Sequence, residues 1–202
     1  MSNDRFMSGW YTWIVMKLLV VVNDEKEIRY LEPVLSIFYK KNIHTKIVTF
    51  SWKYRTQKDW IEEVYRQNGP LDDYFLFGFS LSALVALLVS SQYKVKGLVL
   101  ISVTPLFFET TFPQKVIKYL GKRRLMEAKR IKISRLKILS NEVYLLVGKN
   151  EDSELQKQNA LLSKTDKKIN FQLIKNTSHS AITPEMLEAV ETLITKIKKQ
   201  EL

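Results

Sequence analysis

The chain alternates between short, continuous apolar runs and longer segments in which apolar residues recur every three or four positions. Continuous runs rich in Val, Ile, Leu and Phe are typical of strands buried on both faces of a parallel sheet. The runs predict strands at about residues 12–22, 45–50, 73–79, 96–102, 142–148 and 169–174. Strands that alternate with helices indicate an α/β protein with a parallel, doubly wound sheet.

The intervening segments have the spacing of amphipathic helices. They predict helices at about residues 25–41, 56–67, 81–91, 152–164 and 184–199. The helix over 81–91 is apolar on nearly all sides, as expected for a helix at the centre of such a fold. Thr183 is the predicted N-cap of the last helix, with Pro184 at its first position. Right-handed crossovers would place all the strand C-termini at one edge of the sheet.

The length of 202 residues fits a single domain over 1–202. The chain has no cysteine and two histidines, which excludes disulfides and thiolate metal sites and disfavours a histidine-rich zinc site. We therefore expect neither a metal nor a cofactor. The apolar stretch over 10–22 is interrupted by Lys17 and is shorter than a membrane span. We interpret it as a buried strand of a cytoplasmic protein.

The formal net charge is +11, and a strongly basic surface can attract nucleic acid or anionic lipid. The lysines are scattered along predicted helix faces, so a generally lysine-rich composition is the favoured explanation, and nucleic acid is not a favoured partner. The longest connection, at about 104–140, predicts a short basic helical flap. Its densest basic stretch includes Lys122, Arg123 and Arg124.

The segment 78–83, Gly-Phe-Ser-Leu-Ser-Ala, joins a predicted strand to the apolar helix. A serine at the apex of a sharp strand-to-helix turn, with small residues two positions away on either side, is the arrangement called a nucleophile elbow. Gly78 and Ser82 are small enough for the strand and helix to approach closely, and Ser80 stands at the apex. The alternative role for Ser80 is a helix N-cap, which serine favours.

Further polar groups follow two later strands. Glu151 and Asp152 come after the strand over 142–148, and His179 lies in the loop after the last strand. A serine nucleophile needs a base within hydrogen-bond reach, and the base needs an anion that fixes its tautomer and stabilises its cation. We predict that these groups converge on Ser80; for His179 the alternative is a polar loop residue. His44 precedes an early strand, away from this edge, and is not expected to take part.

The order serine, acid, histidine, each just after a strand, resembles the α/β-hydrolase superfamily. The resemblance covers most of the chain and implies a reduced form of that fold, a three-layer sandwich around a mainly parallel sheet of about six strands in the order 2-1-3-4-5-6. It implies that Ser80 is the nucleophile and His179 the base. The spacing usual in the family selects Glu151 as the acid, although Asp152 is the commoner residue type.

The resemblance also implies an oxyanion hole built from the amide of Leu81 and a second amide after the first strand. Many family members have His-Gly there, whereas this chain has Val22-Asn23-Asp24-Glu25. Asn23 or Asp24 would supply the second amide. Acidic side chains facing inward would oppose a developing oxyanion, but Asp24 is alternatively the N-cap of the following helix.

These features favour a small serine hydrolase that cleaves an ester, a thioester or an activated amide of a small acyl substrate through an acyl-enzyme. The alternative is a protein of the same fold that has lost efficient catalysis and serves as a binding or interaction module through its basic flap. A flavodoxin-like nucleotide or anion binder is a weaker alternative, because neither G-x-G-x-x-G nor a Walker A sequence follows the first strand.

Overall fold

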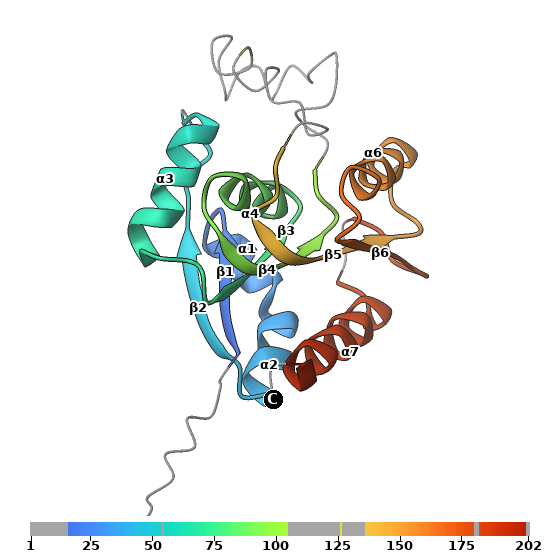
Figure 1. The fold of residues 1–202 in the computed structure, drawn as a ribbon. Helices are drawn as coiled ribbons and strands as arrows, with labels where there is room; N and C mark the ends of the chain where they lie inside the picture. The colour runs from blue at the N-terminus through green and yellow to red at the C-terminus, as the bar shows by residue number, and fades with distance from the viewer. Residues whose placement is uncertain (1–15, 54, 105–125, 127–135, 180–181, 201–202) are drawn as a thin grey trace, which may run out of the picture.

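A computed structural model describes residues 16–53, 55–104, 126, 136–179 and 182–200. In this part of the chain, six strands form one parallel sheet in the order β2-β1-β3-β4-β5-β6 (Figure 1). The strands are β1 (Lys17–Val22), β2 (His44–Thr49), β3 (Tyr74–Phe79), β4 (Val95–Ile101), β5 (Ser140–Gly148) and β6 (Ile169–Ile174). The predicted parallel sheet and its strand order are confirmed. Residues 12–15 of the first predicted strand lie outside the described residues.

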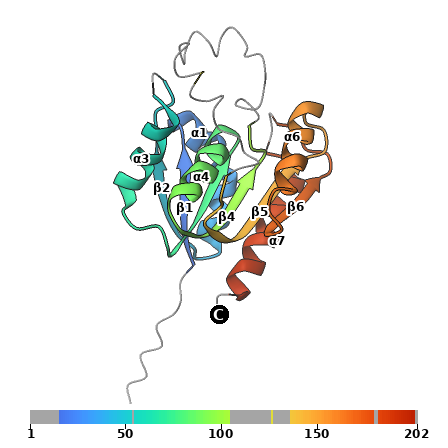
Figure 2. The same ribbon diagram turned by 45° about the horizontal axis from the view of Figure 1, so that its top comes forward.

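Helices cover both faces of this sheet (Figure 1, Figure 2). One face carries α3 (Gln57–Asn68), α4 (Leu81–Gln92) and α6 (Ser153–Ser163), and the other carries α1 (Glu25–Tyr30), α2 (Glu32–Lys40) and α7 (Pro184–Gln200). The fold is therefore the predicted three-layer sandwich. None of the helices described is long and apolar enough to cross a membrane. The predicted flap at 104–140 lies mostly outside the described residues.

The prediction of one continuous helix over 25–41 is wrong. The chain forms two helices, α1 and α2, which meet at the buried residue Leu31. Pro33 explains the break, because proline has no N–H and its ring clashes with the carbonyl four residues earlier in a continuous helix. Proline is tolerated in the first turn of a helix, where Pro33 lies in α2. The break leaves α1 as a separate short element directly after β1.

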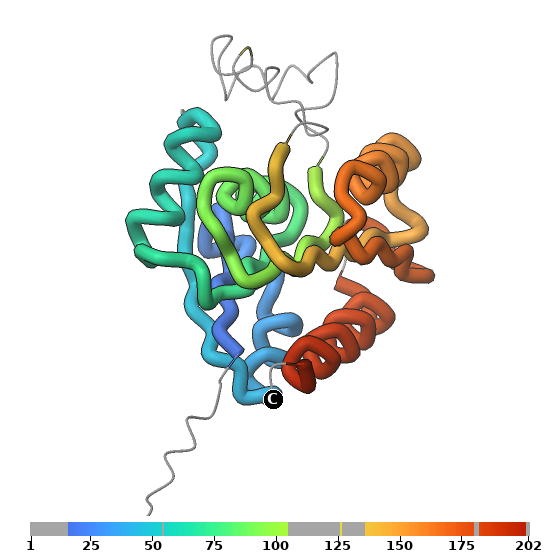
Figure 3. Tube along the Cα trace, in the orientation of Figure 1, coloured from blue at the N-terminus to red at the C-terminus, as the bar shows by residue number. Residues whose placement is uncertain are grey.

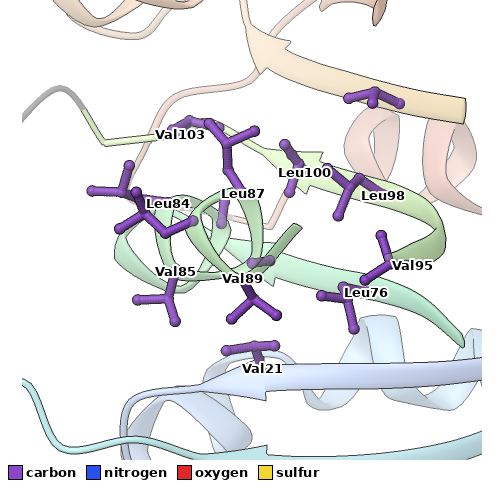
Figure 4. Packing of buried hydrophobic residues seen from close by; sticks show 14 of the residues in the cluster. Val21, Leu76, Leu84, Val85, Leu87, Val89, Val95, Leu98, Leu100 and Val103 are labelled. Atoms are coloured by element: carbon purple, nitrogen blue, oxygen red, sulfur yellow. The ribbon is translucent and has the colours of Figure 1, made fainter. Parts of the chain in front are cut away.

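The helix α4 is the central element of its layer and is buried on nearly all sides, as its sequence predicts. Figure 4 shows Leu87 of α4 beside Leu100 of β4, and Val85 and Val89 of α4 on the side of the helix that faces Val21 of β1. Burying one leucine side chain stabilises a protein by about 1.5–3 kcal/mol. This packing fixes the position of α4, and with it the turn that precedes the helix.

The opposite face of the sheet is covered by α2 and α7, which are far apart in the sequence but lie side by side (Figure 3). Phe38 of α2 makes an edge-to-face contact with Phe77 of β3, with ring centroids 5.3 Å apart. Ile194 of α7 is fully buried in the same cluster. The Nζ of Lys198 donates to the carbonyl of Lys41 at 2.6 Å and ties the two helices together. These contacts hold α7 against the sheet.

The parallel arrangement brings the C-terminal ends of four neighbouring strands to one edge. Phe79 pairs with Ile101, Ile101 is in register with Leu146, and Gly148 pairs with Ile174. Residues that directly follow these strand ends therefore lie near one another.

We predict that Leu87→Ala lowers the free energy of unfolding by about 2–5 kcal/mol, because it leaves a cavity beneath the central helix. Leu87 is fully buried. Urea unfolding followed by circular dichroism measures the loss. Leu161→Ala is the matched control, because Leu161 on α6 is 49% exposed and its truncation should change the unfolding free energy by no more than about 0.5 kcal/mol. Equal losses for the two variants would contradict the packing of α4.

Candidate active site

Ser80 stands at the apex of the turn between β3 and α4. Its backbone has φ 52° and ψ −114°, and such sparsely populated conformations cost non-glycine residues about 1–3 kcal/mol. The Ser80 N–H donates to the carbonyl of Ile101 at 2.9 Å, and its carbonyl accepts from the amide of Thr104 at 3.2 Å. The side chain makes no capping hydrogen bond to α4. The structure therefore does not support the alternative in which the Ser80 side chain caps the helix.

The turn depends on the absence of a side chain at Gly78. A Cβ there would lie 2.5 Å from the carbonyl oxygen of Ser82 and 2.6 Å from the nitrogen of Ala83. Real Cβ atoms do not approach backbone atoms so closely. Glycine therefore lets β3 and the first turn of α4 touch, which the sequence pattern around Ser80 predicted.

His179 lies in the loop after β6 and reaches across to the elbow. Its Nε2 is 2.9 Å from the Oγ of Ser80, which is hydrogen-bond distance. The imidazole ring stacks on Phe79, with centroids 5.3 Å apart and an interplanar angle of 28°. The histidine is therefore placed by the residue that directly precedes the serine as well as by its own loop.

The loop that carries His179 is anchored at both ends. The carbonyl of Thr177 accepts from the amide of Asn150 at 2.9 Å, and the Oγ1 atoms of Thr177 and Thr183 are 2.6 Å apart. Thr183 also accepts from the amide of Met186 at 3.3 Å, as the prediction that it caps α7 requires. The loop is thus tied to the β5 edge on one side and to α7 on the other.

Glu151 completes the constellation, and its two carboxylate oxygens have different partners. Oε2 lies 3.2 Å from the Nδ1 of His179. Oε1 accepts from the amide of Gly148 at 2.7 Å and from the hydroxyl of Ser102. The Glu151 side chain is 1% exposed. One oxygen is therefore held by the strand ends, which aims the other at the histidine.

Asp152, the other predicted acid, points elsewhere. Its side chain caps α6 by accepting from the amides of Glu154 at 2.9 Å and Leu155 at 3.3 Å. The structure therefore brings Glu151, and not Asp152, to His179. His44 begins β2, at the far end of the strand from this edge, and is exposed, so the expectation that it takes no part agrees with its position.

Ser102 belongs to the site, and the sequence interpretation missed it. It directly follows β4, is fully buried, and has φ 51°. That backbone conformation turns its hydroxyl toward Glu151, where it donates to Oε1. The feature of the sequence that could have indicated Ser102 is a hydroxyl residue at the C-terminal end of an otherwise apolar strand.

The loop after β1 uses one of its predicted oxyanion donors internally. The amide of Asn23 donates to Oε2 of Glu27 at 2.6 Å. Asp24 is the N-cap of α1, where it accepts from the amides of Lys26 and Glu27, as the alternative interpretation held. Among the residues described, no acceptor contacts the amide of Asp24 or that of Leu81, the first residue of α4. These two amides are the ones left to hold an anion.

Glu27 is a second residue that the sequence interpretation missed. Besides the Asn23 amide, its Oε2 accepts from the hydroxyl of Ser82 at 2.7 Å. Burial raises the pKa of Glu27 above its usual range, against the opposing effect of these two hydrogen bonds, and nearby Asp24 adds to the rise. The Glu27 carboxyl group therefore lies between the loop after β1 and the first turn of α4, close to the elbow.

Tyr30, at the end of α1, contributes an aromatic wall on this side. Its ring centroid is 5.2 Å from that of Phe79, which in turn stacks on His179. Burial, and secondly the charge of Glu151, raise the pKa of the Tyr30 hydroxyl, so it stays protonated at neutral pH. That hydroxyl is buried and has no hydrogen-bond partner among the described residues.

A groove of about 660 Å³ lies between β6 and α7, lined in part by Leu173, Glu188 and Lys196. It includes neither Ser80 nor His179.

Within the described ranges, no group of three or more His, Asp or Glu side chains is arranged to hold a metal ion.

The sheet order, the three layers and the elbow together define the α/β-hydrolase fold, and the chain has this fold. Solved structures with the same fold support this. Est1E from Butyrivibrio proteoclasticus is similar with a TM-score of 0.70 and 14% sequence identity, over 90% of this chain and 88% of that one. A second structure of Est1E, with ferulic acid bound, is similar to this chain with a TM-score of 0.72.

Two further similar structures differ in their described roles. Mouse alpha/beta hydrolase domain-containing protein 10 has a TM-score of 0.68 and 14% identity over 91% of this chain and 90% of its own. The capsule O-acetyltransferase of Neisseria meningitidis serogroup A has a TM-score of 0.59 and 15% identity over 92% and 88%. The sequence matches no protein-family profile and no curated protein.

We predict that Gly78→Ala lowers the free energy of unfolding by about 1–3 kcal/mol, because the new methyl group forces β3 and α4 apart. Urea unfolding measures the effect. Ser80→Ala is the control, since it alters the same turn but keeps its Cβ, and should change the unfolding free energy by less than about 1 kcal/mol. If Gly78→Ala proved as stable as the control, the close contact at the elbow would be wrong.

Proposed function

We propose that this protein is a serine hydrolase that cleaves an ester, a thioester or an activated amide through an acyl-enzyme. The observation that carries the proposal is the continuous chain of contacts from Ser80 to His179 to Glu151. A hydroxyl, an imidazole and a buried carboxylate in this order supply a nucleophile, a general base and an anion that orients the base.

In the proposed reaction, the Oγ of Ser80 attacks the substrate carbonyl carbon while His179 Nε2 takes the hydroxyl proton. Glu151 Oε2 accepts from Nδ1–H and stabilises the imidazolium that forms. The bond to the leaving group then breaks, and His179 returns the proton to that group. Water attacks the acyl-enzyme by the same proton route, which releases the carboxylic acid and restores Ser80.

The negative charge on the carbonyl oxygen needs two donors. The amide of Leu81 is the first, and the amide of Asp24 is the proposed second, because the Asn23 amide already binds Glu27. Structures of similar fold include carboxylesterases and Est1E with ferulic acid bound, so ester cleavage is the reaction we favour.

A second candidate function is a binding module of this fold with little or no catalysis. The observation that favours it is the engagement of Asn23, because losing one oxyanion donor typically costs about 100- to 1,000-fold in turnover. The basic residues proposed to bind a partner in that case, Lys122, Arg123 and Arg124, lie outside the described residues.

A fluorophosphonate probe should label the wild-type protein at Ser80. The wild-type protein should also hydrolyse short-chain p-nitrophenyl esters, and this hydrolysis should require the same residues as the labelling. Ser80→Ala and His179→Ala should both abolish labelling and reduce turnover by about four to six orders of magnitude, because the nucleophile and base act as one unit. Mass spectrometry locates the label. The control is His44→Ala, which should label as the wild type does.

If well-folded wild-type protein takes up no probe, the hydrolase proposal fails. Salt-sensitive binding to a polyanion, weakened by joint replacement of Lys122, Arg123 and Arg124 with Ala, would then favour the binding module.

Glu151→Gln should reduce kcat by about 100- to 10,000-fold, because the amide cannot stabilise the imidazolium as a carboxylate does. Asp152→Asn is the matched control: asparagine caps helices as well as aspartate does, so both turnover and stability should stay near wild-type values. Steady-state ester hydrolysis and thermal unfolding measure the two properties. A larger loss for Asp152→Asn would assign the acid to Asp152 instead.

A further inference from the structure

We propose that the Glu27 carboxylate restrains the reaction at Ser80, because it engages the Asn23 amide and places a negative charge beside the elbow. This inference rests on the proposed function, since it concerns how the same site stabilises the oxyanion. In this role Glu27 is a positioning residue that acts through the loop after β1 and through its charge.

A single oxygen of Glu27, Oε2, accepts from the Asn23 amide at 2.6 Å and from the Ser82 hydroxyl at 2.7 Å. Asn23 follows β1, where the second oxyanion donor is expected, and Ser82 lies two residues after the proposed nucleophile. The carboxylate therefore bridges the two segments that should supply the oxyanion hole, and it turns one of their amides toward itself.

The groups around Glu27 determine how far its negative charge is offset. Among the described residues, no Lys or Arg forms an ion pair with Glu27. The loop after β1 presents Asp24, which is also acidic, and α4 presents the neutral Ser82 hydroxyl. The charged neighbours on α1 itself, Glu25, Lys26 and Arg29, are exposed. No ion pair with a described cation therefore offsets the negative charge of Glu27, and this charge opposes a second negative charge on the oxyanion.

A near-isosteric substitution of Glu27 can remove its negative charge and keep the oxygen that accepts the two hydrogen bonds. Glu27→Gln keeps one side-chain oxygen, and one oxygen accepts both hydrogen bonds in the structure. The loop after β1 should therefore stay tied to α4, while the negative charge is lost. A residue that only supported the loop would give no gain on this change.

We expect Glu27→Gln to raise kcat/KM for p-nitrophenyl ester hydrolysis about tenfold at pH values above the Glu27 pKa, because it removes a like charge from beside the elbow. It should also tighten inhibition by phenylboronic acid, whose serine adduct is an anionic tetrahedral species, by a similar factor. The matched control is Glu25→Gln, which removes an exposed carboxylate from the same turn of α1 and should change neither quantity.

The pH dependence supplies a second readout. Because burial raises the pKa of Glu27, its carboxylate ionises at a higher pH than an ordinary glutamate, and the restraint operates above that pKa. The ratio of kcat/KM for Glu27→Gln to that for the wild type should be near one well below the Glu27 pKa. It should rise to its plateau as pH increases through that pKa. Because both values are measured at the same pH, the ratio cancels changes in activity that the two proteins share.

A third readout does not depend on activity. In the wild type, the amide proton of Asn23 should move with pH along the titration of Glu27, and this movement should disappear in Glu27→Gln. Nuclear magnetic resonance of labelled protein follows both. An Asn23 amide that does not respond to pH above the ordinary range of a glutamate would overturn the contact on which the inference stands.

The outcomes separate this inference from the proposed function. Fluorophosphonate labelling of Ser80 with no gain, or a loss, in Glu27→Gln would overturn the restraint and leave the hydrolase proposal intact. Absence of labelling in both the wild type and Glu27→Gln would overturn the hydrolase proposal and the restraint together. A gain in Glu27→Gln that is absent in Glu25→Gln would support both.

Discussion

The close contact between β3 and α4 at Gly78 is the constraint on which the rest of the site depends. It forces the residue at the apex into a sparsely populated backbone conformation, which the chain tolerates because α4 is buried on nearly all sides and cannot shift. Two backbone hydrogen bonds of Ser80, to Ile101 and from Thr104, lock the turn to the neighbouring strand end. The position of the Ser80 hydroxyl is therefore set by packing across a whole layer of the fold.

Glu151 shows how a buried carboxylate can be held without a cation. Taking a charge out of water is costly unless hydrogen bonds replace the lost solvation. Here a backbone amide of Gly148 and the hydroxyl of Ser102 bind one oxygen, and His179 lies beside the other. Glu27 differs, because both of its donors share one oxygen; burial, and secondly the nearby Asp24, raise its pKa against the effect of these two hydrogen bonds. The two carboxyl groups thus lie near the elbow with different hydrogen-bond partners.

Most of the fold could be predicted from the sequence because strands buried on both faces leave continuous apolar runs, and the runs at 73–79 and 142–148 fall on β3 and β5, which are buried along most of their length. The geometry at Ser80, Glu151 and His179 followed from their positions after strands, since parallel strands end at one edge. Pro33 is the sequence signal for the break between α1 and α2, although the apolar stripe over 25–41 runs across it. The contacts of Glu27 and Ser102 could not be predicted, because they depend on a helix direction and on a left-handed backbone conformation that only the folded chain fixes.

The packing of α7 against α2 has a consequence for how the protein is made. During synthesis, β1 to β6 emerge before α7, so the part of the sheet face formed by residues such as Leu146 and Ile174 stays uncovered until α7 emerges. The loop that carries His179 takes its C-terminal anchor from Thr183, at the start of the same helix. The nascent chain can therefore form its serine turn early, but the loop of the histidine gains its C-terminal anchor only when α7 docks. Assembly of the site and protection of this apolar face are thus completed in a single late event.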